Sequence, residues 1–117
     1  MSKTITSPIA RWQGTVTLSE PLTLPQAEAI EQAQSLLQEK IKELVEKKIT
    51  EFFFLELDKL KAVAINLCLE KWSLDNFTPL ADNTVPFSPR KESHQLIDWL
   101  FDEILKVYTG DLEVPNE

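Results

Sequence analysis

The chain has 117 residues, a length that suits one compact domain, and its 43% apolar and 26% charged residues are typical of a globular protein rather than a disordered one. Its 2 glycines, Gly14 and Gly110, lie near opposite ends, which excludes the glycine-rich loops that bind phosphates or dinucleotides. With 19 acidic and 12 basic side chains the net charge is −7, so we expect no unaided binding to nucleic acid.

The N-terminal part of the chain predicts a short β element. Residues 1–11 are polar and contain a proline, and we expect them to form a flexible N-terminus. From Trp12 onward apolar residues alternate with polar ones, which predicts a half-buried strand over residues 13–18. We expect this strand to pair with residues 22–24 or with residues 51–55, and the pattern leaves both pairings open.

Helices are predicted along the rest of the chain. Over residues 25–48 apolar positions recur at spacings of three and four, and the proline at the start suits a first helical turn. Residues 58–72 are apolar on most faces, which is typical of the central helix of a domain. The clearest helical stripe covers residues 89–109, and Gly110 supplies its stop. The pattern leaves open whether the first two helices are continuous.

Together these elements predict an α+β fold that is mainly α, with three helices and a small N-terminal β element. We expect a single helical domain over residues 12–110, with a connecting loop over residues 73–88. The acidic residues 111–117 are expected to form a flexible tail.

The counts of cysteine and histidine argue against catalysis. Cys68 is the only cysteine, so an intramolecular disulfide and a cysteine-based zinc site are both excluded. It lies on an apolar helical stripe, and we interpret it as a buried, inert thiol. His94 is the only histidine, and it is expected to be an ordinary surface residue of the last helix. We therefore expect a protein that is not an enzyme and that has no cofactor and no metal site.

Two short segments are candidates for binding a partner. Arg90 and Lys91 lie in the first turn of the last predicted helix, where the helix dipole disfavours positive charge by ~0.3–1 kcal/mol. Either the fold tolerates this small cost, or the pair contacts an acidic partner or the chain's own carboxylates. Phe52, Phe53 and Phe54 cannot all face one core from a helix. They either pack in the core with a small strand or form a patch for partner binding or self-association.

The sequence also bears on location. Residues 1–10 lack the basic start and the apolar run of a signal peptide. No apolar run approaches the ~18–20 residues that cross a bilayer as a helix. We therefore expect a cytoplasmic protein that does not enter a membrane.

Several stretches, taken in order, resemble a known family. They are Ala10–Leu18 with Pro21–Gln26, then Cys68–Leu74, then Val85–Arg90 with Leu96–Leu100 and Tyr108–Glu117. In this order they resemble the small tail assembly chaperones of long-tailed bacteriophages and prophages. The resemblance covers most of the chain but not residues 38–56, and its motifs are structural rather than catalytic.

The resemblance implies a non-catalytic chaperone that binds the tape measure protein in the host cytoplasm and keeps it soluble during tail assembly. In that role we expect the contact surface to comprise Phe52, Phe53, Phe54, Arg90 and Lys91, together with the flank of the first helix. The negative charge would keep bound copies soluble. The alternative is a small acidic phage or prophage inhibitor or adaptor that binds a basic surface of a host protein. Acidic residues are spread evenly along the chain, which counts against mimicry of nucleic acid.

Overall fold

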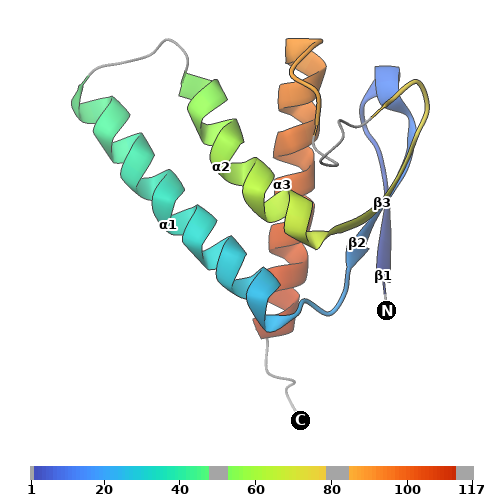
Figure 1. The fold of residues 1–117 in the computed structure, drawn as a ribbon, viewed down its shortest axis with the longest axis horizontal. Coiled ribbons are helices and arrows are strands. Elements are labelled where there is room, and N and C mark those ends of the chain that lie inside the picture. Colours follow the sequence, from blue (N-terminus) through green and yellow to red (C-terminus); the bar gives the residue numbers. More distant parts are fainter. Residues whose placement is uncertain (1, 48–52, 79–84, 113–117) are drawn as a thin grey trace.

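The computed structural model describes residues 2–47, 53–78 and 85–112, and within them it shows three α-helices and one three-stranded sheet (Figure 1). The elements follow in the order β1 (Ser2–Thr6), a short 3-10 helix η1 (Ala10–Trp12), β2 (Gly14–Ser19), α1 (Leu24–Glu46), α2 (Phe53–Cys68), β3 (Leu69–Leu74) and α3 (Arg90–Leu112). The predicted fold class is confirmed: the fold is α+β and mainly α.

The sheet is antiparallel and has the order β1-β2-β3. Strand β2 matches the strand predicted at residues 13–18, but both expected pairings are wrong. Residues 22 and 23 are not part of a strand and Leu24 begins α1, while residues 53–55 are helical and residues 51–52 lie outside the described residues. The partners of β2 are instead β1 and β3, which place Ile5 and Trp72 on either side of Val16.

The N-terminal segment differs from the expected flexible terminus. Ser2–Thr6 forms an edge strand in which Ile5 is buried and its neighbours Thr4 and Thr6 are exposed. Trp12, at the end of η1, is also buried, and its ring meets Phe77 edge-on with the ring centroids 5.0 Å apart. The first residues of the chain therefore belong to the folded domain.

Gly14 begins β2 at a place where a larger residue does not fit. Its φ is +132°, a conformation that side-chain-bearing residues rarely adopt. A Cβ at this position would also collide with the carbonyl oxygen of Ser73 on the neighbouring strand. Glycine is therefore required for the close pairing of β2 with β3.

Helix α1 begins and ends close to the predicted bounds of 25–48. The Thr23 hydroxyl accepts from the Gln26 backbone N–H at 3.4 Å, and the Gln26 side chain accepts from the Thr23 backbone N–H at 2.8 Å. This reciprocal capping box satisfies amides that the first helical turn leaves unpaired. The buried residues of α1 then follow at helical spacing: Ile30, Ala33, Leu37 and Leu44.

The bounds of the second helix correct the prediction of 58–72. Helix α2 begins at Phe53 and ends at Cys68, and Leu69 starts β3 without an intervening loop. The chain leaves the helix there because the next residues hydrogen-bond to β2. This pairing places Trp72 beside Phe77, with the ring centroids 4.7 Å apart.

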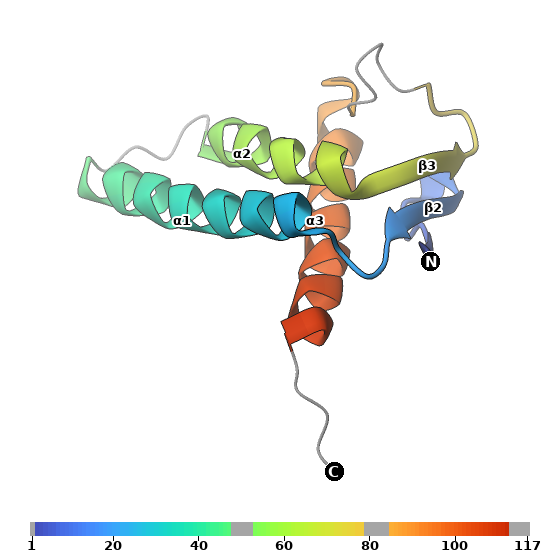
Figure 2. The ribbon, with the colours of Figure 1, turned by 60° about the horizontal axis from the view of Figure 1, so that its bottom comes forward.

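Helices α1 and α2 lie antiparallel as a hairpin, and α3 crosses behind it (Figures 1 and 2). Near the start of α1, the Tyr108 hydroxyl of α3 donates to Glu31 at 2.5 Å. The core lies where the sheet, α3 and the sheet-proximal half of the hairpin meet, and it includes Leu18, Ile65, Leu100 and Ile104. The far end of the hairpin projects away from α3 and the sheet (Figures 1 and 2).

Candidate functional site

The structure describes only some of the predicted site residues. Phe52 lies outside the described residues, and so do the side chains of Phe53 and Phe54, whose backbone begins α2. The aromatic surface therefore stays a prediction, although Phe53 and Phe54 are helical rather than part of a small strand. Arg90 and Lys91 do lie in the first turn of α3.

Arg90 contacts a carboxylate of the chain itself. Its Nη2 atom donates to Oδ2 of Asp58 on α2 at 2.5 Å. Asp58 is only 2% exposed, so its charge is held between the helices rather than in water. Lys91 is exposed. Of the alternatives that the sequence left open for this pair, contact with the chain's own carboxylate holds for Arg90.

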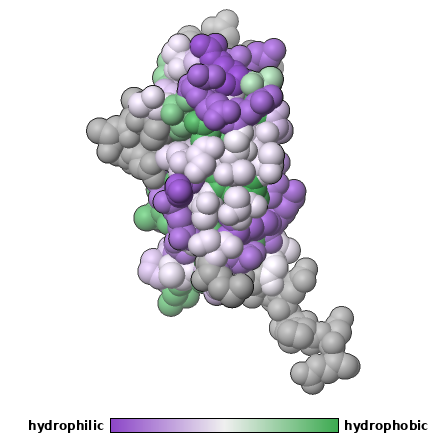
Figure 3. Space-filling model, turned by 90° about the vertical axis from the view of Figure 1, so that its right-hand side faces the viewer, coloured by the Kyte–Doolittle hydropathy of each residue, from purple (hydrophilic) through white to green (hydrophobic). Residues whose placement is uncertain are grey.

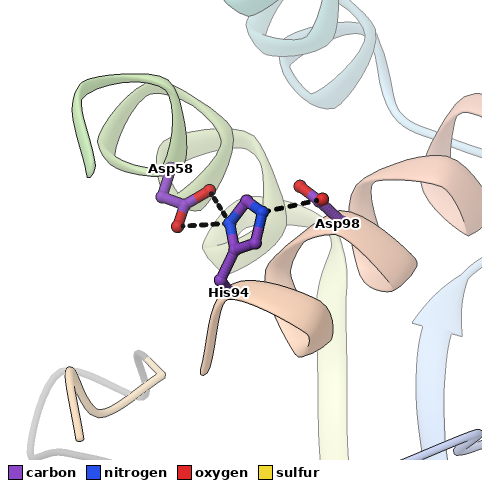
Figure 4. A group of neighbouring side chains, drawn as sticks. All are labelled: Asp58, His94 and Asp98. Carbon is purple, nitrogen blue, oxygen red and sulfur yellow. Dashed lines mark hydrogen bonds and ion pairs between the residues drawn. The ribbon is translucent and has the colours of Figure 1, made fainter. Parts of the chain in front are cut away.

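His94 lies between two carboxylates, which the sequence did not predict. Figure 4 shows its ring between Asp58 of α2 and Asp98 of α3. Nδ1 lies 2.9 and 3.0 Å from the two oxygens of Asp58, and Nε2 lies 3.2 Å from Oδ2 of Asp98. His94 is therefore half-buried within a polar contact rather than an ordinary surface histidine.

A further ion pair extends this contact along the helices. Lys61 of α2 donates to Oδ1 of Asp98 at 2.8 Å, and its ammonium lies 5.7 Å from the ring centroid of Phe101. We call the resulting row the α2–α3 charge network. Its members, in spatial order, are Lys61, Asp98, His94, Asp58 and Arg90. Its two carboxylates alternate with the lysine, the imidazole and the arginine, so the row joins the two helices through polar contacts.

The groups of the network are already paired with one another. Ligand atoms of Asp58, His94 and Asp98 lie within 4.8 Å of one another, a spacing that a metal ion can span. However, the two carboxylates face different nitrogens of the ring, and Arg90 and Lys61 already neutralise them. A cation bound here would have to displace these groups.

A hollow beside the α2–α3 charge network lies next to the starts of α2 and α3, the two helices that carry predicted contact residues. It has a volume of about 300 Å³ and lies between the start of α2, the start of α3 and residues 85–87. Leu55 and Arg90 both line it, so the first turn of α3 lies near the beginning of α2. Phe87 is exposed at its rim, with the Arg90 guanidinium 5.3 Å from its ring centroid.

The helical hairpin exposes apolar side chains. Val45 of α1 is 67% exposed, and Val63 and Leu67 of α2 are 59% and 53% exposed. Leu36 and Ile41 of α1 are exposed as well. By contrast, the face on the sheet side mixes hydrophilic and pale residues, with hydrophobic surface only in small separate areas (Figure 3). The hairpin is therefore the candidate surface for an apolar partner.

A shallow hollow of about 290 Å³ lies on one side of this hairpin. It is lined by Leu36, Glu39, Lys40, Glu43, Glu56 and Leu60. A hydrogen bond from Lys47, at 2.9 Å, and the nearby Lys40 lower the pKa of the Glu43 carboxyl, which keeps it charged. The hollow is thus lined by two leucines, three glutamates and one lysine, a combination of apolar and acidic side chains.

Comparison with known proteins adds no relative: no family model, no curated protein and no solved structure matches the chain. Among the described residues, no helix has both the length and the apolar character that crossing a bilayer requires. Function is therefore inferred from the exposed surfaces of the hairpin and from the sequence resemblance described above.

Proposed function

We propose that this chain is a non-catalytic tail assembly chaperone of a long-tailed phage or prophage. It binds the tape measure protein in the host cytoplasm and keeps it soluble until the tail tube forms around it. The observation that carries the proposal is the projecting α1–α2 hairpin, which exposes valines and leucines on a chain of net charge −7.

The exposed side chains suit a reversible carrier. Burying one valine or leucine contributes about 1.5–3 kcal/mol, so a few such contacts bind a partner without holding it permanently. A helical hairpin is also a suitable surface for helix-in-groove recognition. The surplus negative charge opposes aggregation when many copies bind one long chain.

The resemblance to tail assembly chaperones supplies the identity of the partner. It rests on Ala10–Leu18 with Pro21–Gln26, on Cys68–Leu74, and on Val85–Arg90 with Leu96–Leu100 and Tyr108–Glu117. The hairpin helices include residues 38–46 and 53–56, which lie in the segment that does not share the resemblance. A partner-specific surface at this place is what a chaperone adapted to its own tape measure protein requires.

The test is co-expression with the tape measure protein encoded by the same phage or prophage. We expect the tape measure protein to be soluble and to co-elute with the chain, and to aggregate when expressed alone. An unchanged soluble fraction together with no co-elution would overturn the proposal. The variant Phe53→Ser with Phe54→Ser, checked for an intact fold, then tests whether the predicted aromatic surface takes part.

The salt dependence of the complex separates the proposal from the alternative of an acidic inhibitor or adaptor. Binding through apolar side chains persists when the salt concentration is raised, whereas binding of exposed carboxylates to a basic surface is screened. Some weakening in high salt is expected of a carrier whose acidic side chains assist binding, but a complex that dissociates completely in high salt would favour the inhibitor or adaptor.

A further inference from the structure

One side of α2 carries a row of side chains that runs from the edge of the core onto exposed surface. Glu56, Leu60, Val63 and Leu67 follow one another at spacings of four, three and four, so they share one side of the helix. Leu60 is half-buried at the hollow, while Val63 and Leu67 are exposed. The row therefore begins at the hollow between the helices and continues onto open surface.

Helix α1 borders the same row from the other side. Leu36 lines the hollow together with Leu60, which places these two side chains on one flank of the hairpin. Further along, the Gln26 side chain donates to the carbonyl oxygen of Leu67 at 2.8 Å, so the antiparallel helices stay in contact over the length of the row. We call this surface the outer flank; its apolar members are Leu36, Leu60, Val63 and Leu67.

The rim of the outer flank is acidic. Glu39, Glu43 and Glu56 line the hollow against a single lysine there, Lys40. Lys47 also pairs with Glu43, which leaves Glu39 and Glu56 as the carboxylates with the most charge to offer a partner. An apolar stripe bordered by carboxylates is complementary to an apolar stripe bordered by cations.

We propose that the outer flank binds an amphipathic helix whose apolar stripe is bordered by lysine and arginine. The side chains of such a helix fill the hollow at Leu36 and Leu60 and cover Val63 and Leu67, while its cations reach Glu39 and Glu56. A second copy of the chain is a poorer occupant, because it brings one acidic rim against another. Only the identity of the helix rests on the proposed function. Under that function, the helix is a segment of the tape measure protein.

The test uses two synthetic helical peptides of about 18 residues, or five turns, that share one leucine stripe. One peptide borders the stripe with lysine and arginine, and the other borders it with glutamate. Fluorescence anisotropy of labelled peptide measures binding to the intact chain. We expect the basic peptide to bind at least about tenfold more tightly than the acidic one. Equal binding of the two peptides, or no binding of either, overturns the proposal.

Matched variants test whether the basic peptide binds at the outer flank. Val63→Ser with Leu67→Ser should weaken binding of the basic peptide about tenfold or more. The control is Leu24→Ser, which removes an apolar side chain that is 74% exposed at the start of α1, outside the outer flank. The control should leave binding unchanged. An effect of the control without an effect of the test variant contradicts the assignment.

A charge variant keeps the test valid if the serine variant fails to fold. Glu39→Lys with Glu56→Lys should reverse the preference between the two peptides, and an unchanged preference refutes the acidic rim. Size-exclusion chromatography of the chain alone examines self-association: a dimer that Val63→Ser with Leu67→Ser dissociates would assign the flank to a second copy and overturn the proposal. None of these measurements includes the tape measure protein, so failure of the proposed function and failure of this inference are distinguishable.

Discussion

Replacing Asp58 with asparagine removes the buried charge that both Arg90 and His94 contact. The carboxylate is 2% exposed, with Arg90 Nη2 at 2.5 Å and His94 Nδ1 at 2.9 Å. Removing one partner of a buried ion pair costs about 3–5 kcal/mol, because the other charge is left uncompensated. Here the side chains of Arg90 and His94 stay 33% and 25% exposed, so water compensates them in part. We therefore expect Asp58→Asn to lower the free energy of unfolding by about 2–4 kcal/mol.

Urea unfolding followed by far-UV circular dichroism measures this change, and Asp98→Asn is the matched control. Asp98 also pairs with His94 and with a lysine, but its side chain is 44% exposed. Surface pairs contribute about 0–1 kcal/mol, so the control should lose no more than that. In a double-mutant cycle, Asp58→Asn and Arg90→Ala should couple by about 1 kcal/mol or more. A loss at Asp58 no larger than that at Asp98, or additive effects in the cycle, would refute the reasoning.

The remaining predictions concern the sheet, the helix start and the buried thiol. Gly14→Ala should lower stability by at least about 1–3 kcal/mol, because the new Cβ meets Ser73 and φ is positive; a melting temperature equal to that of the wild type would contradict this. Thr23→Ala removes the cap of α1 and should cost about 1 kcal/mol in urea unfolding, whereas Thr23→Ser should cost less. Burial raises the pKa of the Cys68 thiol from 9.0 to about 11, so the unfolded chain loses this proton first and stability should fall as the pH rises from 9 to 11. Cys68→Ala should remove this part of the slope, and equal slopes of unfolding free energy against pH in the two proteins would show that the thiol has no such effect.

The amphipathic helices α1 and α3 were predictable because their signals are local. The apolar residues of each repeat at helical spacing, and α1 carries its own start signal in Thr23, Pro25 and Gln26. The observed ends of both helices lie within a few residues of the expected ones, but α3 continues through Gly110, the expected stop, to Leu112, so residues 111 and 112 are helical rather than part of the expected tail. Sequence patterns predict such elements well when a single face is buried against one core.

The strands at the edges of the sheet were not predictable because their signals are not local. β1 buries one apolar side chain, Ile5, so it shows no alternation that a sequence pattern would detect. β3 follows α2 without a break, and its residues continue the helical pattern as far as Trp72. Both segments become strands because β2 supplies hydrogen-bonding partners on each edge, which is a tertiary effect.

The α2–α3 charge network also depends on long-range contact. Asp58 and His94 come from different helices, and nothing in their own surroundings indicates that they meet. One signal was present: Arg90, His94 and Asp98 are polar or charged residues at intervals of four, which places them on one side of α3. Such a row shows that one side of the helix is polar. It does not identify the residues of another helix that contact this side.

The two sides of α2 explain why its sequence was misleading. The prediction took an all-round apolar helix to be a central one, but charged residues of α2 face α3 while apolar residues face outward. Asp58 and Lys61 are held by α3, whereas Val63 and Leu67, which lie more than a quarter turn away from them, remain exposed. Among the described residues, Val63 and Leu67 do not belong to the core cluster. Exposed apolar side chains on a helix fixed to the domain by buried charge are what a rigidly presented binding site requires.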